Sequence, residues 1–385
     1  MRKGWQEGHV LVAPDKFKGS LTAPEVAAHI AAGLRRARPD TPVVTAPVAD
    51  GGDGTVDAMV AAGFARLQTG VTGPVGESVA ASFAMRGETA VVELAEASGL
   101  RRLPDRPDAT TALTATSAGT GELMRTAAMR GAKRIVLGLG GSACTDGGAG
   151  MLTALGARLL DEDGRPIPPG GVGLLRLARI ETDEMLRIPV VVASDVDNPL
   201  LGERGAAEVY GPQKGAGPNE VAQLKAGLAR LAEIVRREIG VDAADRPGAG
   251  AAGGVGFTAL AVLSATIRPG IEIMLEELDF DALLAGARLV ITGEGSLDRQ
   301  TLHGKAPMGV ARAAARAEVP VVAVAGQRQL TRDVLRRFGF EDAYALTDIE
   351  PDPEVCMAQG GALLEQLCAR IADAHLGSSL IRNNQ

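Results

Sequence analysis

The sequence predicts an α/β fold with two domains, and three observations support this prediction. The chain has 385 residues, which is more than one hydrophobic core usually organises. Hydrophobic residues make up 46% and aromatic residues only 3%, so Ala, Val, Leu and Ile must fill the cores, as is typical of parallel sheets covered by helices. Strand and helix patterns alternate at both ends of the chain and change in the middle. We therefore expect a Rossmann-like domain built from residues 1–65 and 287–385, with a second domain inserted at residues 66–286.

The N-terminal part begins with alternating strands and helices. An apolar run predicts a strand over residues 9–13. Thr22 and Glu25 have the spacing of a capping box, which predicts that a helix starts there. A second strand is expected over residues 43–48, followed by a second helix over residues 55–62.

The middle part has a different pattern. Three apolar runs are separated by Gly-containing turns without helices, which predicts antiparallel strands over residues 65–71, 77–85 and 89–94. Beyond them we expect strands over residues 134–139 and 190–193, and helices over residues 118–130, 148–155, 219–238 and 257–265. Residues 249–256 are predicted to form a glycine-rich loop.

The C-terminal part returns to strand–helix alternation. Predicted strands cover residues 289–292, 319–325 and 343–346, and predicted helices cover residues 306–317, 331–338 and 354–374. This alternation is typical of a parallel sheet with helical crossovers.

Four loops rich in glycine and carboxylates directly follow predicted strands, over residues 50–54, 140–148, 194–199 and 293–298. In open α/β sheets, ligands bind at the carboxyl ends of the strands. Glycines let backbone N–H groups approach phosphate oxygens, and carboxylates can hold Mg²⁺ or accept a proton from a hydroxyl. Phosphoryl transfer needs all three features, so the loops favour a small-molecule kinase.

The first strand ends in a polar loop that contains Asp15, Lys16, Lys18 and Ser20. The lysines could bind phosphate, with Lys16 and Lys18 as catalytic candidates, while Asp15 and Ser20 could bind substrate. Alternatively the loop is merely solvated, with Ser20 or Thr22 capping the helix.

The next loop contains Asp50, Gly51, Gly52 and Asp53, followed by another glycine. A plain turn needs only one Asp or Asn and one glycine, so we favour a ligand or Mg²⁺ role over a structural turn. Asp50 is a candidate catalytic group, and Gly51, Gly52 and Asp53 are candidate binding residues.

The loop after residue 139 supplies Gly140, Gly141, Ser142, Asp146 and Gly147 as candidate phosphate-binding residues. Residues 138–143 also match G-x-G-x-x-A, so a dinucleotide site is an alternative interpretation. A third interpretation is a glycine-rich turn that serves packing alone.

Three further candidates lie between residues 190 and 215. Asp195 and Asp197 follow a Val-rich strand, where alternating carboxylates suggest a proton acceptor (Asp195) and a metal ligand (Asp197), or only turn chemistry before Pro199. Lys214 lies in a turn and could contact phosphate.

The densest polar cluster lies over residues 292–305. Glu294 and Asp298 could hold Mg²⁺, Gly293 would admit the ligand, and Lys305 would neutralise charge at a helix start.

Composition excludes several other classes. A net charge of −7 without a basic run argues against nucleic-acid binding. Residues 1–8 lack the apolar core of a signal peptide, and no apolar run is long enough to span a membrane. Three unpaired cysteines fit a cytoplasmic location. The P-loop, protein-kinase and α/β-hydrolase motifs are missing.

The motifs together resemble the bacterial type-1 glycerate kinase family. They occur in order, over residues 13–21, 49–55, 115–121, 139–148, 211–215 and 292–305. The resemblance runs from about residue 9 to about residue 375, and only the short N-terminal extension and the polar tail depart from it.

The resemblance implies ATP-dependent phosphorylation of D-glycerate with Mg²⁺, usually at the 2-hydroxyl, giving 2-phosphoglycerate; 3-phosphoglycerate is the alternative product. It also implies that the inserted domain is flavodoxin-like and that the active site lies between the domains. Homodimer formation is left open. Two hypotheses from other classes are an NAD-dependent oxidoreductase and a non-catalytic sugar-acid binding protein.

Overall fold

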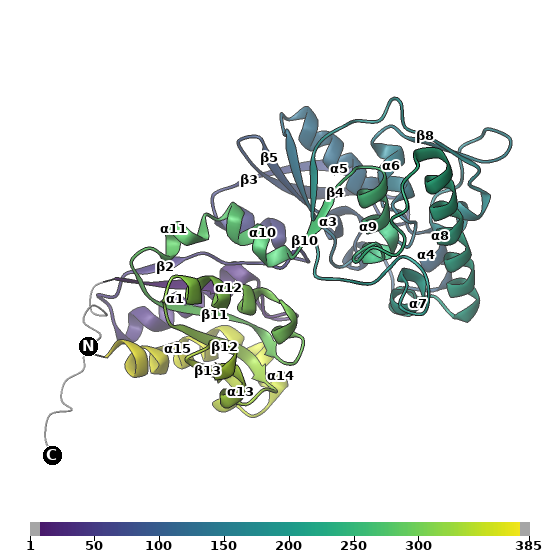
Figure 1. Cartoon of the computed structure of the whole chain (residues 1–385). Helices are drawn as coiled ribbons and strands as arrows, with labels where there is room; N and C mark the ends of the chain where they lie inside the picture. The colour runs from purple at the N-terminus through teal and green to yellow at the C-terminus, as the bar shows by residue number, and fades with distance from the viewer. Residues whose placement is uncertain (1–7, 378–385) are drawn as a thin grey trace, which may run out of the picture. The chain divides into compact units, whose positions relative to one another are not determined.

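In the computed structural model, which describes residues 8–377, the chain packs as two compact units (Figure 1). The first unit consists of residues 8–50, 57–62 and 271–377, and the second of residues 51–56 and 63–270. Residues 51–56, 63–65 and 271–286 thus pack with a different unit from the one expected. The domain boundaries at residues 65/66 and 286/287 stay a prediction. The segment in which we expect no signal peptide lies almost wholly outside the described residues.

The first unit is built on a five-stranded sheet in the order β13-β12-β11-β1-β2, and every neighbouring pair is parallel. Its strands are β1 (His9–Pro14), β2 (Val43–Thr45), β11 (Ala287–Leu297), β12 (Val321–Arg328) and β13 (Asp342–Ala345). The parallel sheet predicted from the strand–helix alternation is therefore confirmed. Loops at the carboxyl ends of β1 and β11 meet at the same edge, because these two strands are direct neighbours.

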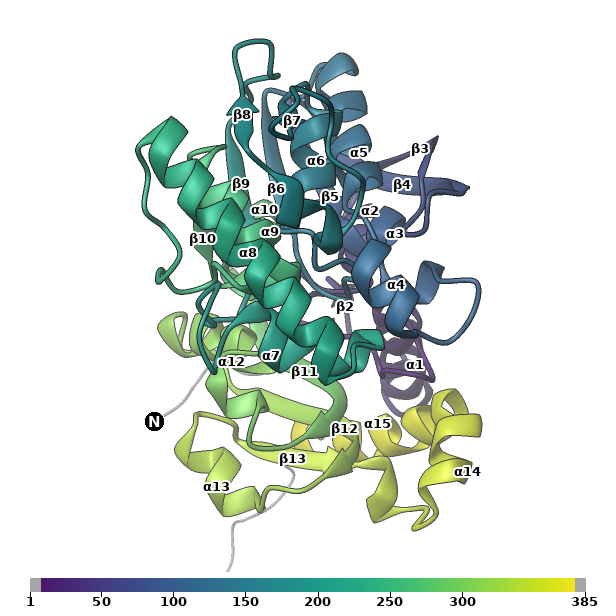
Figure 2. The same cartoon turned by 90° about the vertical axis from the view of Figure 1, so that its right-hand side faces the viewer.

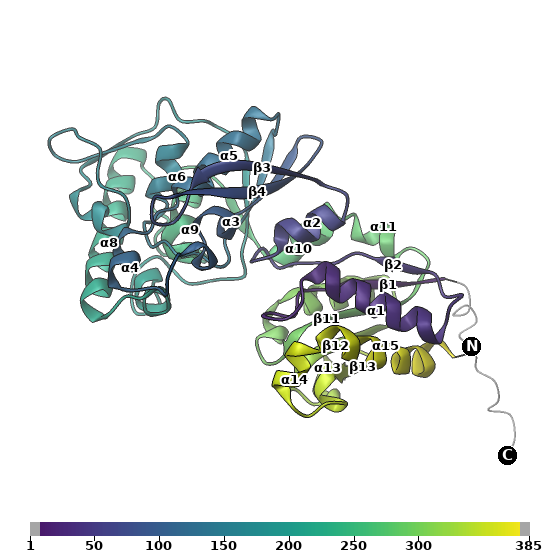
Figure 3. The same cartoon turned by 180° about the vertical axis from the view of Figure 1, so that it is seen from behind.

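Helices cover both faces of this sheet. They are α1 (Ala23–Ala37), α10 (Gly270–Glu277), α11 (Phe280–Leu284), α12 (Ala306–Arg316), α13 (Arg332–Arg337), α14 (Pro353–Ala358) and α15 (Gly360–Leu376), and α2 (Thr55–Ala61) ends in this unit. The capping box at the start of α1 is confirmed, with Thr22 and Glu25 exchanging backbone-to-side-chain hydrogen bonds. The helices α1 and α15 lie side by side (Figure 3), and a Cβ atom at Gly33 would overlap the backbone of α15.

The second unit contains a six-stranded mixed sheet in the order β10-β9-β6-β5-β4-β3. Its strands are β3 (Ala65–Thr72), β4 (Ser78–Arg86), β5 (Thr89–Glu93), β6 (Arg134–Gly138), β9 (Val190–Ala193) and β10 (Thr266–Arg268). The pairs β3–β4 and β4–β5 are antiparallel, as predicted, and the other pairs are parallel. The carboxyl ends of β5, β6 and β9 therefore share one edge.

The helices of the second unit are α3 (Leu94–Ser98), α4 (Ala109–Thr114), α5 (Ala118–Met129), α6 (Ala149–Ala154), α7 (Ala206–Tyr210), α8 (Pro218–Ile239) and α9 (Ala251–Ala261). A small hairpin, β7 (Arg158–Leu160) with β8 (Arg179–Glu181), lies apart from the main sheet. The 22-residue α8 packs against α4 and α7 (Figure 2). None of the helices between residues 8 and 377 is long and apolar enough to cross a membrane.

Several predicted segments differ in their bounds: the second strand, expected over residues 43–48, ends at Thr45, and three others differ for a local reason. The strand expected over residues 289–292 continues to Leu297, because its pairing with β12 persists through residues expected to form a loop. The predicted loop over residues 249–256 contains the first turns of α9, which bend where Ala252, Gly253 and Gly254 have positive φ. The final helix is broken at Gln359, just before two consecutive glycines, which are weak helix formers.

Candidate active site

In the second unit, three backbone segments approach one another at the carboxyl edge of the sheet. A Cβ atom at Gly138 would overlap the carbonyl oxygen of Gly51, and one at Gly140 would overlap the Cα atom of Gly52. A Cβ atom at Gly51 would lie 2.6 Å from the carbonyl oxygen of Ala193. Only glycine permits these approaches, so the loop after β6, the end of β9 and the segment 51–54 form one continuous backbone surface. Two of the predicted loops are thus brought together.

The loop from Gly140 to Gly148 is ordered by Asp146, whose side chain is fully buried. Its carboxylate accepts hydrogen bonds from the backbone N–H and the hydroxyl of Ser117, both at 2.8 Å, and from the backbone N–H of Gly148 and Gly150. Gly147 and Gly148 have φ values of 63° and 83°, which only glycine adopts without strain. Asp146 therefore shapes the turn into α6, and its role in phosphate binding stays a prediction.

Lys214 reaches this loop from a short 3₁₀ helix, η3 (Pro212–Lys214). Its side chain is 2% exposed, and its Nζ donates to Ser142 Oγ at 2.9 Å and to the carbonyl oxygen of Cys144 at 2.6 Å. Burial lowers the pKa of Lys214. The hydroxyl of Thr145, in the same loop, is buried and has no hydrogen-bond partner in the described chain. A buried cation therefore contacts this loop, and the loop itself contains a buried hydroxyl without a hydrogen-bond partner among the described residues.

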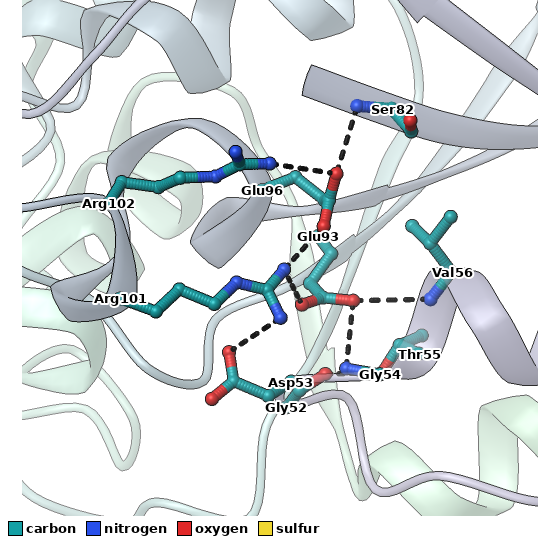
Figure 4. Close-up of polar contacts among 10 residues, drawn as sticks. All are labelled: Gly52, Asp53, Gly54, Thr55, Val56, Ser82, Glu93, Glu96, Arg101 and Arg102. Carbon is teal, nitrogen blue, oxygen red and sulfur yellow. Dashed lines mark hydrogen bonds and ion pairs between the residues drawn. The ribbon is translucent and has the colours of Figure 1, made fainter. Parts of the chain in front are cut away.

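Asp53 lies against the same loop and pairs with Arg101 (Figure 4). Arg101 comes from η1 (Leu100–Arg102), and its guanidinium also donates to Glu93 Oε1 at 3.0 Å and to Glu96. Glu93 is 1% exposed, and burial raises its pKa to about 7 against the opposing effect of Arg101.

The sequence interpretation missed Glu93, Glu96 and Arg101. One signal was available. Glu93 is a carboxylate at the end of the strand predicted over residues 89–94, and a carboxylate at a strand end is the feature that marked the other candidate loops. The two arginines after Gly99 stand in a segment without any recognisable motif, so nothing in the sequence pointed to Arg101.

The two carboxylates after β9 are exposed and have separate partners. Asp195 Oδ1 accepts a hydrogen bond from the backbone N–H of Gly270 at 3.1 Å. Asp197 pairs with Arg204 at 3.1 Å, and Asn198 accepts from the Tyr210 hydroxyl at 2.7 Å. Asp195 and Asp197 therefore do not form one cluster.

In the first unit, the loop after β1 places Asp15 at the sheet edge. Asp15 is 8% exposed, and its N–H donates to the carbonyl oxygen of Gly293 at 2.8 Å. Burial raises the pKa of Asp15 to about 7, with Asp50 acting in the same direction and Lys16 opposing it. These side chains are therefore close enough to influence one another.

The rest of this loop is less buried. Lys16 is half-buried and Lys18 is exposed. The hydroxyl of Ser20 donates to the carbonyl oxygen of Met357 at 2.8 Å, and Thr22 caps the helix. Ser20 thus anchors the loop to the end of α14.

The polar cluster at the end of β11 is assembled as the sequence suggests. Glu294 Oε1 accepts from the Thr301 hydroxyl at 2.6 Å, and Lys305 Nζ lies 3.3 Å from Glu294 Oε2 and 3.9 Å from Asp298 Oδ1. Burial raises the pKa of Glu294. A Cβ atom at Gly293 would overlap the carbonyl oxygen of Val324, so only glycine fits there.

The carboxylates of Glu294 and Asp298 suit a magnesium ion. Mg²⁺ prefers oxygen ligands and commonly binds through one or two carboxylates, with water and phosphate oxygens completing its shell. The buried hydroxyl of Ser296, between them in sequence, has no hydrogen-bond partner among residues 8–377. No group of three His, Cys, Asp or Glu side chains in the described chain could hold a metal alone. These residues therefore fit a metal that arrives with a phosphate ligand.

The chain is similar to known proteins over nearly its whole length. Residues 10–376 match the model of the glycerate kinase family. The chain is 43% identical to a glycerate kinase of Halalkalibacterium halodurans, over 94% of this chain and 97% of the relative. It is 46% identical to a glycerate 2-kinase of Escherichia coli (strain K12), over 84% and 86%.

A solved structure is similar over nearly the whole length. The crystal structure of a protein described as glycerate kinase 2 from Salmonella typhimurium LT2 matches with a TM-score of 0.83 and 41% identity, covering 96% of this chain and 98% of that one. The predicted α/β class is thereby confirmed, and the comparisons support a kinase rather than an oxidoreductase or a non-catalytic binding protein. The chain belongs to the glycerate kinase family.

Proposed function

We propose that this kinase transfers the γ-phosphoryl group of ATP to the 2-hydroxyl of D-glycerate and releases 2-phosphoglycerate. The observation that carries the proposal is the continuous backbone surface of the second unit, with the buried Lys214 beneath the loop after β6. The choice of hydroxyl is supported by the E. coli relative, which is named a glycerate 2-kinase.

The loop from Gly140 to Gly148 is proposed to bind the phosphates of ATP. Gly141 is exposed, so a phosphate oxygen can approach its backbone N–H, whereas the N–H groups of Gly147 and Gly148 already donate to Gly253 and Asp146. Lys214 would add positive charge next to the loop while its hydrogen bond holds Ser142 in place. The hydroxyl of Thr145, which has no hydrogen-bond partner in the described chain, would donate to a phosphate oxygen. A buried cation acts more strongly on a phosphate than an exposed one, because the local dielectric is low.

Asp195 is proposed to accept the proton of the glycerate hydroxyl, with Asp50 and Asp53 as the alternative acceptors. Asp195 is exposed at the end of a strand, where a substrate can reach it. Lys16 and Lys18 would offset the charge of the phosphoryl group in transit, with Asp15 orienting Lys16 through the turn that they share.

Mg²⁺ is proposed to accompany ATP, bound by Glu294 and Asp298, with Lys305 contributing the remaining positive charge. When bound, the ion would neutralise negative charge on the phosphates. Asp197, in the second unit, is a further candidate metal ligand, and its ion pair with Arg204 would have to open for it to bind. A cytoplasmic location and a homodimer stay predictions from the sequence.

The test is to incubate the purified protein with D-glycerate, Mg²⁺ and ATP, to follow ADP release, and to identify the product by phosphorus NMR. Formation of 2-phosphoglycerate is expected. Formation of 3-phosphoglycerate would retain the kinase and contradict the choice of hydroxyl, and an intact protein that releases no ADP would contradict the proposal as a whole.

The proton acceptor is tested by Asp195→Asn, with Asp183→Asn as the matched control. Asp183 is an exposed aspartate of the same unit that contacts none of the candidate residues. We expect the first change to lower kcat about a hundredfold or more and the second to leave it unchanged. Near-normal turnover by the first variant would transfer the role to Asp50 or Asp53.

A further inference from the structure

Arg101 is surrounded by carboxylates from three different segments (Figure 4). Its guanidinium donates to Glu93 Oε1 at 3.0 Å and to Glu96, and its Nη1 lies 3.8 Å from Asp53 Oδ1. Glu96 is held in turn by the backbone N–H of Ser82 at 3.0 Å. The guanidinium is thus held by hydrogen bonds to Glu93 and Glu96 and lies within ion-pair distance of Asp53.

Glu93 continues this network to the backbone of the segment 51–56. Its Oε2 accepts hydrogen bonds from the N–H of Gly54 at 3.1 Å and from the N–H of Val56 at 3.2 Å. The carboxylate therefore satisfies two backbone donors at the start of α2, while Arg101 balances its charge.

The segment that carries Arg101 is also attached to the glycine-rich loop. The backbone N–H of Leu100 donates to the carbonyl oxygen of Gly141 at 2.9 Å. A Cβ atom at Gly141 would lie 2.7 Å from Asp53 Oδ1, so the Asp53 carboxylate is in direct contact with this glycine. Arg101 thus lies where the segment 51–54 and the loop after β6 meet.

We propose that Arg101 is a positioning residue, which fixes the carboxylate of Asp53 beside the glycine-rich loop and, through Glu93, fixes the backbone of residues 54–56. The inference rests on the proposed function, in which this loop binds ATP phosphates. A carboxylate next to bound phosphate repels it unless a cation neutralises it and holds it in one rotamer. Arg101 supplies the cation at ion-pair distance, because its Nη1 lies 3.8 Å from Asp53 Oδ1 while its Nη2 donates to Glu93 and Glu96.

This pairing differs from an ordinary surface ion pair. The Arg101 side chain is 40% exposed, which alone would make its contacts weak. The Glu93 side chain, however, is 1% exposed, so removing the guanidinium leaves a buried carboxylate without its cation. The cost is then transmitted to the two amide groups that Glu93 holds.

The test compares Arg101→Met, Arg101→Lys, Asp53→Asn and the double variant R101M/D53N. The control is Arg158→Met, which removes another arginine of the second unit, paired at 2.8 Å with Glu181 on the β7–β8 hairpin. We measure kcat and KM for both substrates, the melting temperature, and hydrogen exchange of residues 51–62.

Arg101→Met is expected to lower kcat/KM tenfold to a hundredfold and to speed exchange at Gly54 and Val56. Arg101→Lys should recover part of the activity. Lysine keeps the positive charge but lacks the two terminal guanidinium nitrogens that contact different carboxylates. The double variant should lose less than the sum of the two single losses, since Arg101 acts partly through Asp53 and partly through Glu93, and R158M should match the wild type. Partial rescue of R101M by added methylguanidinium would confirm that the missing group is the guanidinium even where the variant is less stable.

Two results would overturn the inference: an R101M variant with wild-type kinetics and exchange, or losses that add fully in the double variant. A wild-type protein that does not phosphorylate glycerate contradicts the proposed function instead. In that case hydrogen exchange still tests the positioning role of Arg101. Unchanged exchange at residues 51–56 in R101M would overturn this role, and faster exchange would support it.

Discussion

Four charged residues near the candidate loops share one property, which is burial of the side chain. Asp15, Glu93, Lys214 and Glu294 all have a pKa shifted by burial away from the charged form. Burial of a charge costs free energy, and such groups concentrate at functional sites, where their chemistry offsets the cost. The four residues come from four separate segments, so the pattern is a property of the fold.

Glu93 makes the stability of the protein depend on pH. Its pKa rises from 4.5 in the unfolded chain to about 7 on folding, so between these values the folded protein binds more protons. Stability must therefore fall as the pH rises through this window, by at most on the order of 3 kcal/mol from this group. Arg101 limits the effect, whereas Glu96 and Asp53 add to it.

Glu93→Gln removes this titration, so its melting temperature relative to the wild type should increase between pH 5 and pH 8. Thermal melts of both proteins across that range measure the difference. The matched control is Glu88→Gln, which changes an exposed glutamate paired with Lys133. Parallel curves for wild type and E93Q would show that Glu93 does not titrate in this range.

Lys214 allows a second test at the residue scale. Lys214→Met keeps the length of the side chain but leaves Ser142 Oγ and the Cys144 carbonyl without their donor. We expect the KM for ATP to rise about tenfold or more, because a hydrogen bond from a charged group contributes roughly 1.5–3 kcal/mol. Steady-state kinetics measure it, with Lys225→Met, at an exposed pair with Glu208, as the control. An unchanged KM would restrict Lys214 to a role in stability.

At the scale of elements, the strand ends were the most predictable feature. Apolar runs followed by glycine and carboxylates located the ends of β1, β6 and β9 to within one residue, because a buried strand and its loop differ sharply in composition. The sequence could not locate Arg101, because its partners Asp53 and Glu93 lie in other segments and only the folded chain brings them together. Nor could it show that β11 extends to Leu297, since that extension depends on pairing with β12.

The contact between the glycine loops gives a prediction for these elements. Gly140→Ala would place a Cβ atom against the backbone of Gly52, so the two segments would have to separate. We expect a loss of about 1–3 kcal/mol in stability, as for other overpacked sites, and a fall in kcat/KM of at least tenfold. Chemical denaturation and kinetics measure the two effects.

Gly70→Ala on β3 is the matched control, because a Cβ atom there would have only Ser78 Oγ within 4 Å, at 3.9 Å. It should leave kinetics unchanged. Equal effects of the two substitutions, or normal kinetics in G140A, would mean that close approach of the loops is not needed for activity.

At the scale of the whole molecule, each unit has its own hydrophobic core. The core of the second unit includes Phe83, Leu137 and Leu228, and that of the first includes Ile30, Ile291 and Leu364. The change of pattern along the chain indicated the second core, since strands without helices stand between stretches of alternation. Segments 51–56 and 271–286 could not be placed from sequence, because their packing depends on contacts with distant parts of the chain.

Nucleotide binding should therefore stabilise the protein in a way that distinguishes the kinase from a dinucleotide-binding protein. A ligand at a hundredfold excess over its Kd adds about 2.7 kcal/mol to the stability of the form that binds it, which corresponds to a rise in melting temperature of roughly 5–10 °C for a unit of this size. We expect a non-hydrolysable ATP analogue with Mg²⁺ to produce such a rise, with slower hydrogen exchange over residues 140–148. Gly140→Ala should weaken both effects, while NAD⁺ should produce neither. Stabilisation by NAD⁺ without any response to the ATP analogue would mean that the glycines after β6 hold a dinucleotide, and phosphate binding by this loop would have to be abandoned.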